Sequence, residues 1–143
     1  MEQTLAIIKP DGVKRRLVGE CIGRFENKGL IITAIKSGKI SVAKANILYN
    51  HIKQKYPKVF KSLISFMTDN PVVFMVIEGK GVVKKVRKIC GPTDPATAPK
   101  GTIRGDFGRG NMKILTARGE TLKNIIHASG SLEEAKKEIK LFF

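Results

Sequence analysis

Three stretches of the chain are almost continuously apolar and rich in β-branched residues. They cover residues 4–9, 30–35 and 71–77, and Gly or Pro residues lie at their ends. Runs of this length between turn residues are typical of buried strands. We therefore predict three buried strands, and a fourth, shorter strand just before the last helix.

Between these stretches, apolar residues recur at helical spacing. The pattern predicts helices over residues 13–28, 41–55, 58–67, 80–90 and 132–143. Ser131 and Glu134 form a capping-box pattern that opens the last of them. Residues 91–111 are rich in Gly and Pro and indicate a long functional loop. Periodicity leaves open whether residues 112–123 form a small hairpin or an irregular insertion.

The order of these elements predicts the fold class. Strands and helices alternate as in a split βαβ sandwich, an α+β, ferredoxin-like fold with a four-stranded antiparallel sheet. We expect helices to cover one face of that sheet. The 143 residues and the 42% hydrophobic content suit a single domain over residues 1–143.

The charge balance points to anionic partners. The chain has 27 Lys and Arg against 12 Asp and Glu, a formal net charge of +15. Nucleotides, nucleic acid and acidic surfaces all fit such an excess, and charge alone does not choose among them.

Cysteine and histidine content excludes two classes of site. Cys21 and Cys90 are too few for a disulfide framework, and with His51 and His127 they are too scattered for a zinc site. A reducing cytoplasm fits best. The chain has no signal-peptide pattern and no run long enough to span a bilayer, so we expect a soluble cytoplasmic protein with no membrane partner.

His127 is the strongest candidate for a nucleophile. A neutral imidazole has a free lone pair near neutral pH and can accept and release a group. His127 lies just before a helix N-terminus, where backbone N–H groups and the dipole favour phosphate. Glu138 borders the apolar stripe of that helix, where it could orient the imidazole or simply pair with a lysine. A lone histidine is more often structural than catalytic, so the residues around His127 decide between the two roles.

Several cationic and hydroxyl side chains could join His127. Lys9 ends an apolar strand face, where it is either a snorkelling stem or a phosphate-binding charge. Arg87 borders the apolar stripe of its helix and can reach into a cleft, and its guanidinium suits phosphate oxygens. Thr93 and Arg104 lie inside the long loop and favour an anion-binding role for it. Arg104-Gly105-Asp106 also matches an adhesion tripeptide, which the lack of secretion features argues against.

Familiar nucleotide-binding motifs are missing. The chain has neither a Gly-x-x-x-x-Gly-Lys-Ser/Thr loop nor the sequence elements of protein kinases. If the protein handles nucleotides, it binds them in another way.

Taken together, the separate motifs resemble the nucleoside diphosphate kinase family. The likeness spans nearly the whole chain and rests on Lys9-Pro10-Asp11-Gly12-Val13, Arg87, Thr93, the segment 101–107 and the segment 124–129. Several motifs in the right order are far more specific than any one of them. The resemblance implies ping-pong transfer of the γ-phosphate from a nucleoside triphosphate to a nucleoside diphosphate, through a phosphohistidine at the position of His127.

The resemblance also implies roles around the phosphates. Lys9, Arg87 and Arg104 would surround the migrating charge, and Thr93 would donate its hydroxyl. Mg²⁺ would be held mainly by the phosphates of the nucleotide. The nucleotides would include ATP, GTP and GDP, and nucleic acid would be at most a secondary partner. The family also implies a homo-oligomer, with a hexamer first and a tetramer or dimer as alternatives.

Further roles concern the sugar, the base and the histidine. Asn124 and Lys9 would touch the ribose, while Ser129 and Glu138 would steady the imidazole. Phe60 would cover the base if the register holds. A base held without hydrogen-bond readout would explain tolerance of many nucleosides.

The chain departs from the family pattern at four places. Gly130 stands where the family usually has aspartate, which predicts one missing charge near the metal and the loop. Pro99 is displaced by one residue from the usual Pro-Gly-Thr. The segment 108–123 includes about ten extra residues, which would alter the base pocket or the assembly. Tyr49 and His51 both lie near the place of a family tyrosine.

Two rival functions come from other classes. One is a nucleic-acid-binding protein on the same scaffold, but seven Phe, two Tyr and no Trp give little material for an aromatic platform. The other is a nucleotide sensor that binds without turnover, which the missing charge at Gly130 would favour.

Overall fold

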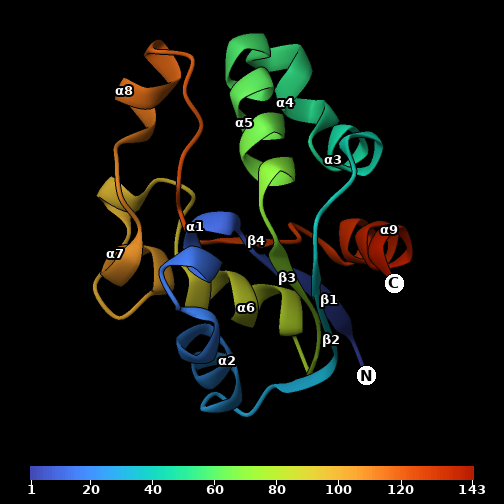
Figure 1. Ribbon diagram of the computed structural model, residues 1–143. Helices are drawn as coiled ribbons and strands as arrows, with labels where there is room; N and C mark the ends of the chain where they lie inside the picture. Colours follow the sequence, from blue (N-terminus) through green and yellow to red (C-terminus); the bar gives the residue numbers. More distant parts are fainter.

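The structure is a computed structural model that describes residues 1–143. Its centre is one antiparallel sheet in the order β2-β3-β1-β4 (Figure 1). The strands are β1 (Gln3–Ile8), β2 (Ile31–Gly38), β3 (Val72–Glu78) and β4 (Ile126–Ala128). All three pairings are antiparallel. The predicted four-stranded antiparallel sheet of an α+β sandwich is therefore confirmed.

Helices cover both faces of the sheet, so the expectation of one covered face was wrong. Alternate side chains of β1 enter different cores: Ala6 and Ile8 pack in one cluster, and Leu5 and Ile7 in the other. The physical reason lies in the strand sequences, because an uninterrupted apolar run is what a strand buried on both faces requires.

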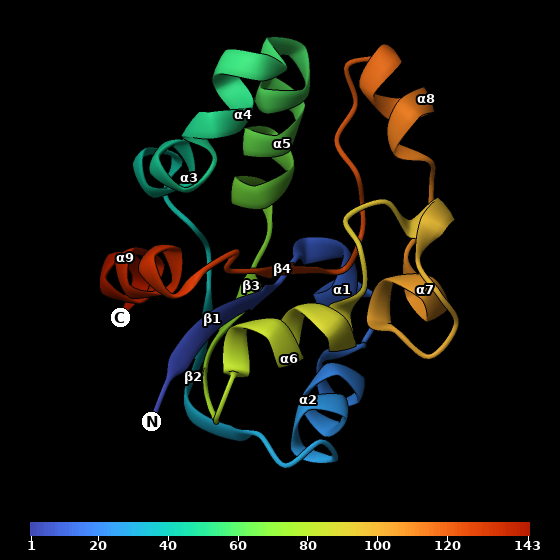
Figure 2. The same ribbon diagram turned by 180° about the vertical axis from the view of Figure 1, so that it is seen from behind.

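The first core lies under α2 (Val18–Glu26) and α6 (Val82–Cys90), which Figure 2 shows beside the sheet. The short helix α1 (Pro10–Lys14) follows β1 directly. The helix predicted over 13–28 is thus two helices. The break falls at Arg16, whose φ of 61° is left-handed and cannot continue a right-handed helix.

The second core lies under α3 (Val42–Leu48), α5 (Pro57–Asp69) and α9 (Leu132–Phe142). The helix predicted over 41–55 is divided at Tyr49 into α3 and α4 (Asn50–Lys55). Tyr49 is buried in this core with φ −110° and ψ 17°, outside the helical range. Tertiary packing of the aromatic ring therefore overrides the helical periodicity.

The long loop contains short helices of its own: η1 (Pro95–Thr97) and α7 (Ile103–Phe107). The segment 108–123, which periodicity left open, contains α8 (Met112–Ala117), capped by the Asn111 side chain. Its ends meet in an isolated antiparallel bridge between Arg109 and Lys123. The segment is therefore a helix-containing loop whose two ends pair with each other, and it is neither a hairpin nor irregular. No helix in the molecule has the length and apolar character needed to cross a membrane.

The buried centre of β1 should dominate stability. Leu5→Ala should lower the free energy of unfolding by about 2–5 kcal/mol, because Leu5 is fully buried and its loss leaves a cavity. Ile35→Ala is the control: Ile35 is 51% exposed on the edge strand, and its loss should cost less than about 0.5 kcal/mol. Urea denaturation measures both, and equal losses would contradict the two-core description.

Candidate active site

His127 lies on the edge strand β4, opposite Ile7 of β1. Its Nε2 is 2.6 Å from Oε1 of Glu138, on α9. The Ser129 hydroxyl donates to the same carboxylate oxygen at 3.0 Å. The His127 and Glu138 side chains keep 16% and 13% of their surface exposed. One ring nitrogen is therefore held by a carboxylate, and the other, Nδ1, is left for chemistry.

Tyr49 packs against the same imidazole. The two rings meet edge to face with centroids 5.9 Å apart and planes at 84°. The Tyr49 hydroxyl is buried without a hydrogen-bond partner, and burial, reinforced by the charge of Glu138, raises its pKa. His51 is exposed on α4. The structure thus resolves the alternative that the sequence left open, because Tyr49 is the residue beside His127.

Lys9 is a buried cation at the end of β1. Its Nζ donates to Asn124 Oδ1 at 2.7 Å, and the Asn124 amide donates to the Thr93 carbonyl at 2.9 Å. Burial, with the nearby charge of Arg104, lowers the pKa of Lys9 to about 8, and the charge of Asp11 partly opposes this. Lys9 has no carboxylate in salt-bridge contact, so its charge is available to an incoming anion.

Arg104, on α7, joins the histidine strand β4 to the residue that follows α6. Its Nη1 donates to the Gly91 carbonyl at 2.7 Å and its Nη2 to the Ile126 carbonyl at 2.6 Å. Its Nε is buried and has no partner. Burial also lowers its pKa. Arg104 is therefore a second buried cation held by neutral oxygens.

Arg87 and Thr93 are exposed near this pair. Arg87 lies in the last turn of α6, and its carbonyl accepts from the Gly91 N–H at 2.9 Å. Its charge contributes to lowering the pKa of Arg104, as expected for neighbouring cations. The four residues are thus linked. Lys9 and Thr93 both bond to Asn124, and the charge of Arg104 acts on Lys9 while that of Arg87 acts on Arg104.

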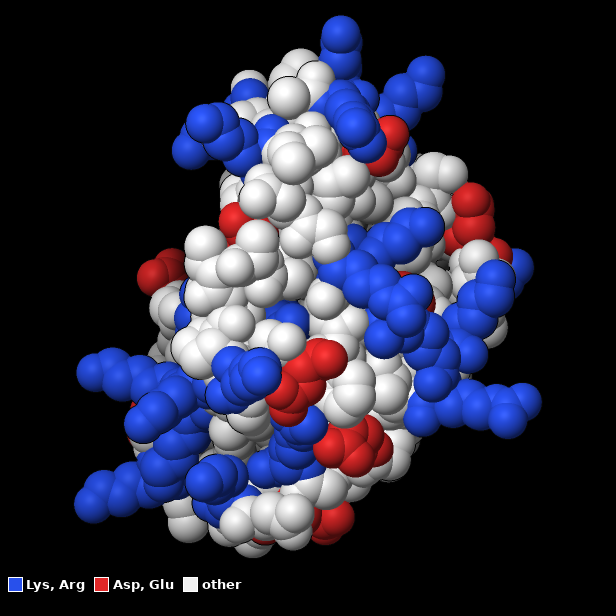
Figure 3. Space-filling model, turned by 90° about the vertical axis from the view of Figure 1, so that its left-hand side faces the viewer, with Lys and Arg blue, Asp and Glu red and all other residues white.

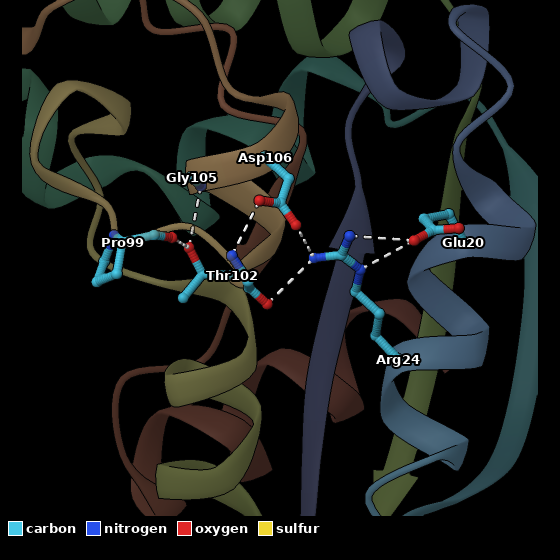
Figure 4. A network of polar contacts seen from close by, with 7 residues as sticks. Glu20, Arg24, Pro99, Thr102, Gly105 and Asp106 are labelled. Carbon is cyan, nitrogen blue, oxygen red and sulfur yellow. Dashed lines mark hydrogen bonds and ion pairs between the residues drawn. The ribbon is translucent and has the colours of Figure 1, made fainter.

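Arg24 of α2 fixes the loop that carries α7 (Figure 4). Its guanidinium contacts Glu20 at 3.1 Å and Asp106 at 2.8 Å, and it donates to the Gly101 carbonyl at 3.2 Å. The other oxygen of Asp106 accepts from the Gly101 N–H at 2.9 Å. Asp106 is therefore occupied within the molecule, which explains the Arg-Gly-Asp tripeptide as part of an internal anchor.

The start of α7 is equally well fixed. Thr102 caps the helix: its hydroxyl donates to the Pro99 carbonyl at 2.6 Å and accepts from the Gly105 N–H at 3.0 Å (Figure 4). A Cβ on Gly105 would lie 1.9 Å from the Pro99 carbonyl oxygen, so only glycine fits. This local packing sets the direction in which Arg104 leaves the helix.

The segment 108–123 contacts α5. The Thr121 N–H donates to the Ser62 hydroxyl at 3.1 Å, and Lys123 Nζ lies 5.9 Å from the Phe66 ring centroid. The Asp94 carboxylate accepts from the Met112 N–H at 3.1 Å. The extra segment is therefore pinned both to α5 and to the residue after Thr93.

Phe60 lies away from this segment. Its ring packs against the second core, with Lys53 Nζ 5.8 Å from the ring centroid. At 3.6 residues per turn, Phe60 points to the side of α5 opposite Ser62, while Val59 shares the Ser62 side. The structure thus places Phe60 on the core side of α5, whereas Val59 lies, by helical phase, on the side that meets the segment 108–123. Counting residues from Pro57, where α5 begins, would have indicated from the sequence on which side of the helix each of the two residues lies.

The backbone of Gly130 contacts a carboxylate from the first turn of α9. The Glu134 carboxylate accepts from the Gly130 N–H at 2.8 Å, and a Cβ on Gly130 would lie 2.6 Å from Glu134 Oε2. Ser131 Oγ accepts from the Glu134 N–H at 3.1 Å, as the predicted cap requires. A carboxylate therefore does lie beside position 130, because the longer Glu134 side chain folds back from the first turn of α9.

Most of the positive charge is not neutralised within the molecule. Among Lys and Arg, only Arg24 and Lys137 form salt bridges with carboxylates. Figure 3 shows Lys and Arg side chains spread over one face, with only a few acidic groups between them. No three His, Cys, Asp or Glu side chains lie close enough together to hold a metal ion. Lys9 and Arg104 are among the cations without a salt bridge, so the site is suited to a polyanion.

The sequence of this chain is similar to those of many known proteins. A family model described as nucleoside diphosphate kinase matches residues 2–143. Nucleoside diphosphate kinases from Saccharolobus islandicus and Sulfurisphaera tokodaii are 46% and 47% identical, over all of this chain and 95% and 89% of theirs.

Solved structures agree with these sequence relatives. A transition state mimic of nucleoside-diphosphate kinase from Borrelia burgdorferi with bound vanadate and ADP superposes with a TM-score of 0.93 at 39% identity, covering 99% of this chain and 86% of that one. An NDP kinase from Pyrobaculum aerophilum gives 0.87 at 33% identity, with 99% and 95% covered.

The Arg24 anchor should contribute measurably to stability. Arg24→Ala should lower the free energy of unfolding by about 1 kcal/mol after allowance for solvent screening, because it removes bonds to Asp106 and Gly101. Lys137→Ala is the control, since Lys137 and Glu133 form an ion pair that is 76% and 81% exposed, and it should change little. Equal midpoints in urea for Arg24→Ala and the unmodified protein would show that the anchor does not hold α7.

Proposed function

The chain belongs to the nucleoside diphosphate kinase family, and on this premise we propose that His127 carries the phosphate. Its activity is the ping-pong transfer of a γ-phosphate from a nucleoside triphosphate to a nucleoside diphosphate. The observation that supports His127 most strongly is the contact of its Nε2 with Glu138 at 2.6 Å, which leaves Nδ1 free.

In the first half-reaction, the Nδ1 lone pair attacks the γ-phosphorus, and the bond from that phosphorus to the leaving diphosphate oxygen breaks. The proton on Nε2 stays in place and donates to Glu138, which stabilises the positive charge that the ring acquires. Ser129 holds the same carboxylate and so fixes its orientation. In the second half-reaction, a terminal oxygen of the acceptor diphosphate attacks the phosphorus, and the N–P bond breaks.

Lys9, Arg87 and Arg104 supply positive charge where phosphate oxygens gain negative charge during transfer. Thr93 offers its hydroxyl to phosphate, and Asn124 with Lys9 contacts the ribose. Mg²⁺ held mainly by the nucleotide's phosphates would add further charge neutralisation when bound.

The base lies beside α5 and the segment 108–123. Val59 faces this space by helical phase, and Phe60 supports it from the opposite side of α5. A contact surface of this kind, without a dedicated hydrogen-bond pattern, accepts several bases.

Three broader features complete the proposal. Residues 1–143 act as one domain, since both cores share the same sheet. The chain forms a homo-oligomer, a hexamer first and a tetramer or dimer otherwise, supported by Ile31 and Ile35, which are 59% and 51% exposed on the edge strand β2. Two free, buried cysteines support a cytoplasmic location.

Labelling tests the phosphate carrier. Incubation with γ-labelled ATP and Mg²⁺ should give an acid-labile, alkali-stable label on the protein that moves to added GDP. His127→Ala should abolish the label, whereas the control His51→Ala should retain it, because His51 is exposed on α4. ATP binding without a labelled protein would favour a sensor, and salt-sensitive binding of single strands without transfer would favour nucleic-acid recognition.

The pH profile tests Lys9. Its ammonium is charged below its lowered pKa of about 8, so its contribution to transfer should be present at pH 7 and lost as the pH rises through that value. Plots of kcat/KM against pH should show an alkaline decline near 8. Lys9→Met should be slower at pH 7 and lack that decline, and an unchanged profile in this variant would exclude Lys9 as the titrating group.

A further inference from the structure

Resting on the proposed function, we propose that Asp11 is a positioning residue that sets the distance between Asn124 and His127. Asp11 itself touches neither the imidazole nor the space for phosphate. It acts on the turn that joins these two site residues, through Ile125.

Ile125 has an unusual backbone for its residue type. Its φ is 76°, in the left-handed region that β-branched residues avoid, and its side chain is fully buried. Such a conformation persists only where the surroundings enforce it, and it occurs preferentially at functional sites. Here it falls between Asn124, which contacts Lys9, and His127.

Both polar groups of the Ile125 backbone are held by the segment that follows β1. Its N–H donates to Asp11 Oδ2 at 3.1 Å, and its carbonyl accepts from the Lys9 N–H at 2.8 Å. A Cβ on Gly12 would lie 3.0 Å from the Ile125 carbonyl oxygen and 2.8 Å from Ile8 Cγ2. Gly12 therefore allows the turn to approach, and Asp11 fixes it there.

This arrangement closes a loop of contacts around the site. Lys9 reaches Asn124 through its side chain at 2.7 Å, while Asp11 reaches the next residue along the chain. Beyond the turn, β4 pairs with β1 so that His127 lies opposite Ile7. If Ile125 relaxed to a negative φ, Asn124 would leave Lys9 and the start of β4 would shift.

The Asp11 carboxylate has a second effect through its charge. Its Oδ1 is buried without a partner, and its charge favours the ammonium form of Lys9 against burial and Arg104. The groups that act on Lys9 are therefore Arg104 from α7, Asp11 from α1 and the neutral amide of Asn124. A substitution at position 11 can remove the negative charge and still keep an oxygen that accepts from the Ile125 N–H.

Two substitutions separate these effects. Asp11→Asn keeps an acceptor oxygen for the Ile125 N–H but removes the charge, so transfer should persist and the alkaline decline of kcat/KM should move below that of the unmodified enzyme. Asp11→Ala removes both, and kcat/KM below pH 7 should fall on the order of 100-fold, as expected when reacting groups are misplaced by about 1 Å. Asp69→Ala, on the exposed end of α5, is the control and should behave as the unmodified enzyme.

Activity should be measured per folded molecule, with the folded fraction taken from circular dichroism. The proposal is supported if Asp11→Ala is folded but slow, and if Asp11→Asn restores the rate with a shifted profile. It is overturned if both variants match the rate and the pH profile of the unmodified enzyme. It is also overturned if the fall in activity of Asp11→Ala equals its fall in folded protein and the pH profile of Asp11→Asn does not move. A failure of the unmodified enzyme to form phosphohistidine would instead overturn the proposed function.

Discussion

The antiparallel pairing of β1 with β4 is the constraint on which the site depends. It places His127 opposite Ile7 and, just beyond the end of β1, brings Lys9 against Asn124, 115 positions away in the sequence. Two further side chains of the site attach to this pair of strands. Arg104 reaches the Ile126 carbonyl from α7, and Glu138 reaches the imidazole from α9. A strand of three residues thus collects groups from most of the chain.

The two buried cations, Lys9 and Arg104, share an electrostatic feature that explains the chemistry. Their charges are held by neutral oxygens of Asn124, Gly91 and Ile126 rather than by carboxylates in direct contact. Burying a cation without an anion costs free energy, and the lowered pKa of each group reflects this. The free energy is recovered when a phosphate arrives, because preorganised charge in a partly dry site acts on it without reorganisation.

Sequence reasoning predicted the strands and the grouping of the cationic residues, and it failed where distant packing decides. The apolar run predicted β1 as a buried strand, but the expectation of one covered face missed its burial on both sides. The division of α3 from α4 at Tyr49 has no local Gly or Pro signal, and only the folded chain shows that Tyr49 rather than His51 meets His127. The carboxylate beside Gly130 comes from Glu134, a contact set by rotamer choice. The orientation of Phe60 depends on helix phase, which apolar periodicity alone did not fix.

Glu138 occupies Nε2 and so leaves Nδ1 of His127 to carry the phosphate in the proposed mechanism. Nitrogen-15 and phosphorus-31 NMR of the phosphorylated protein, labelled at histidine, tests it most directly. We expect phosphorus coupled to Nδ1, with a proton retained on Nε2. Phosphorus coupled to Nε2, or a phosphorylated protein with an unmodified His127, would contradict it.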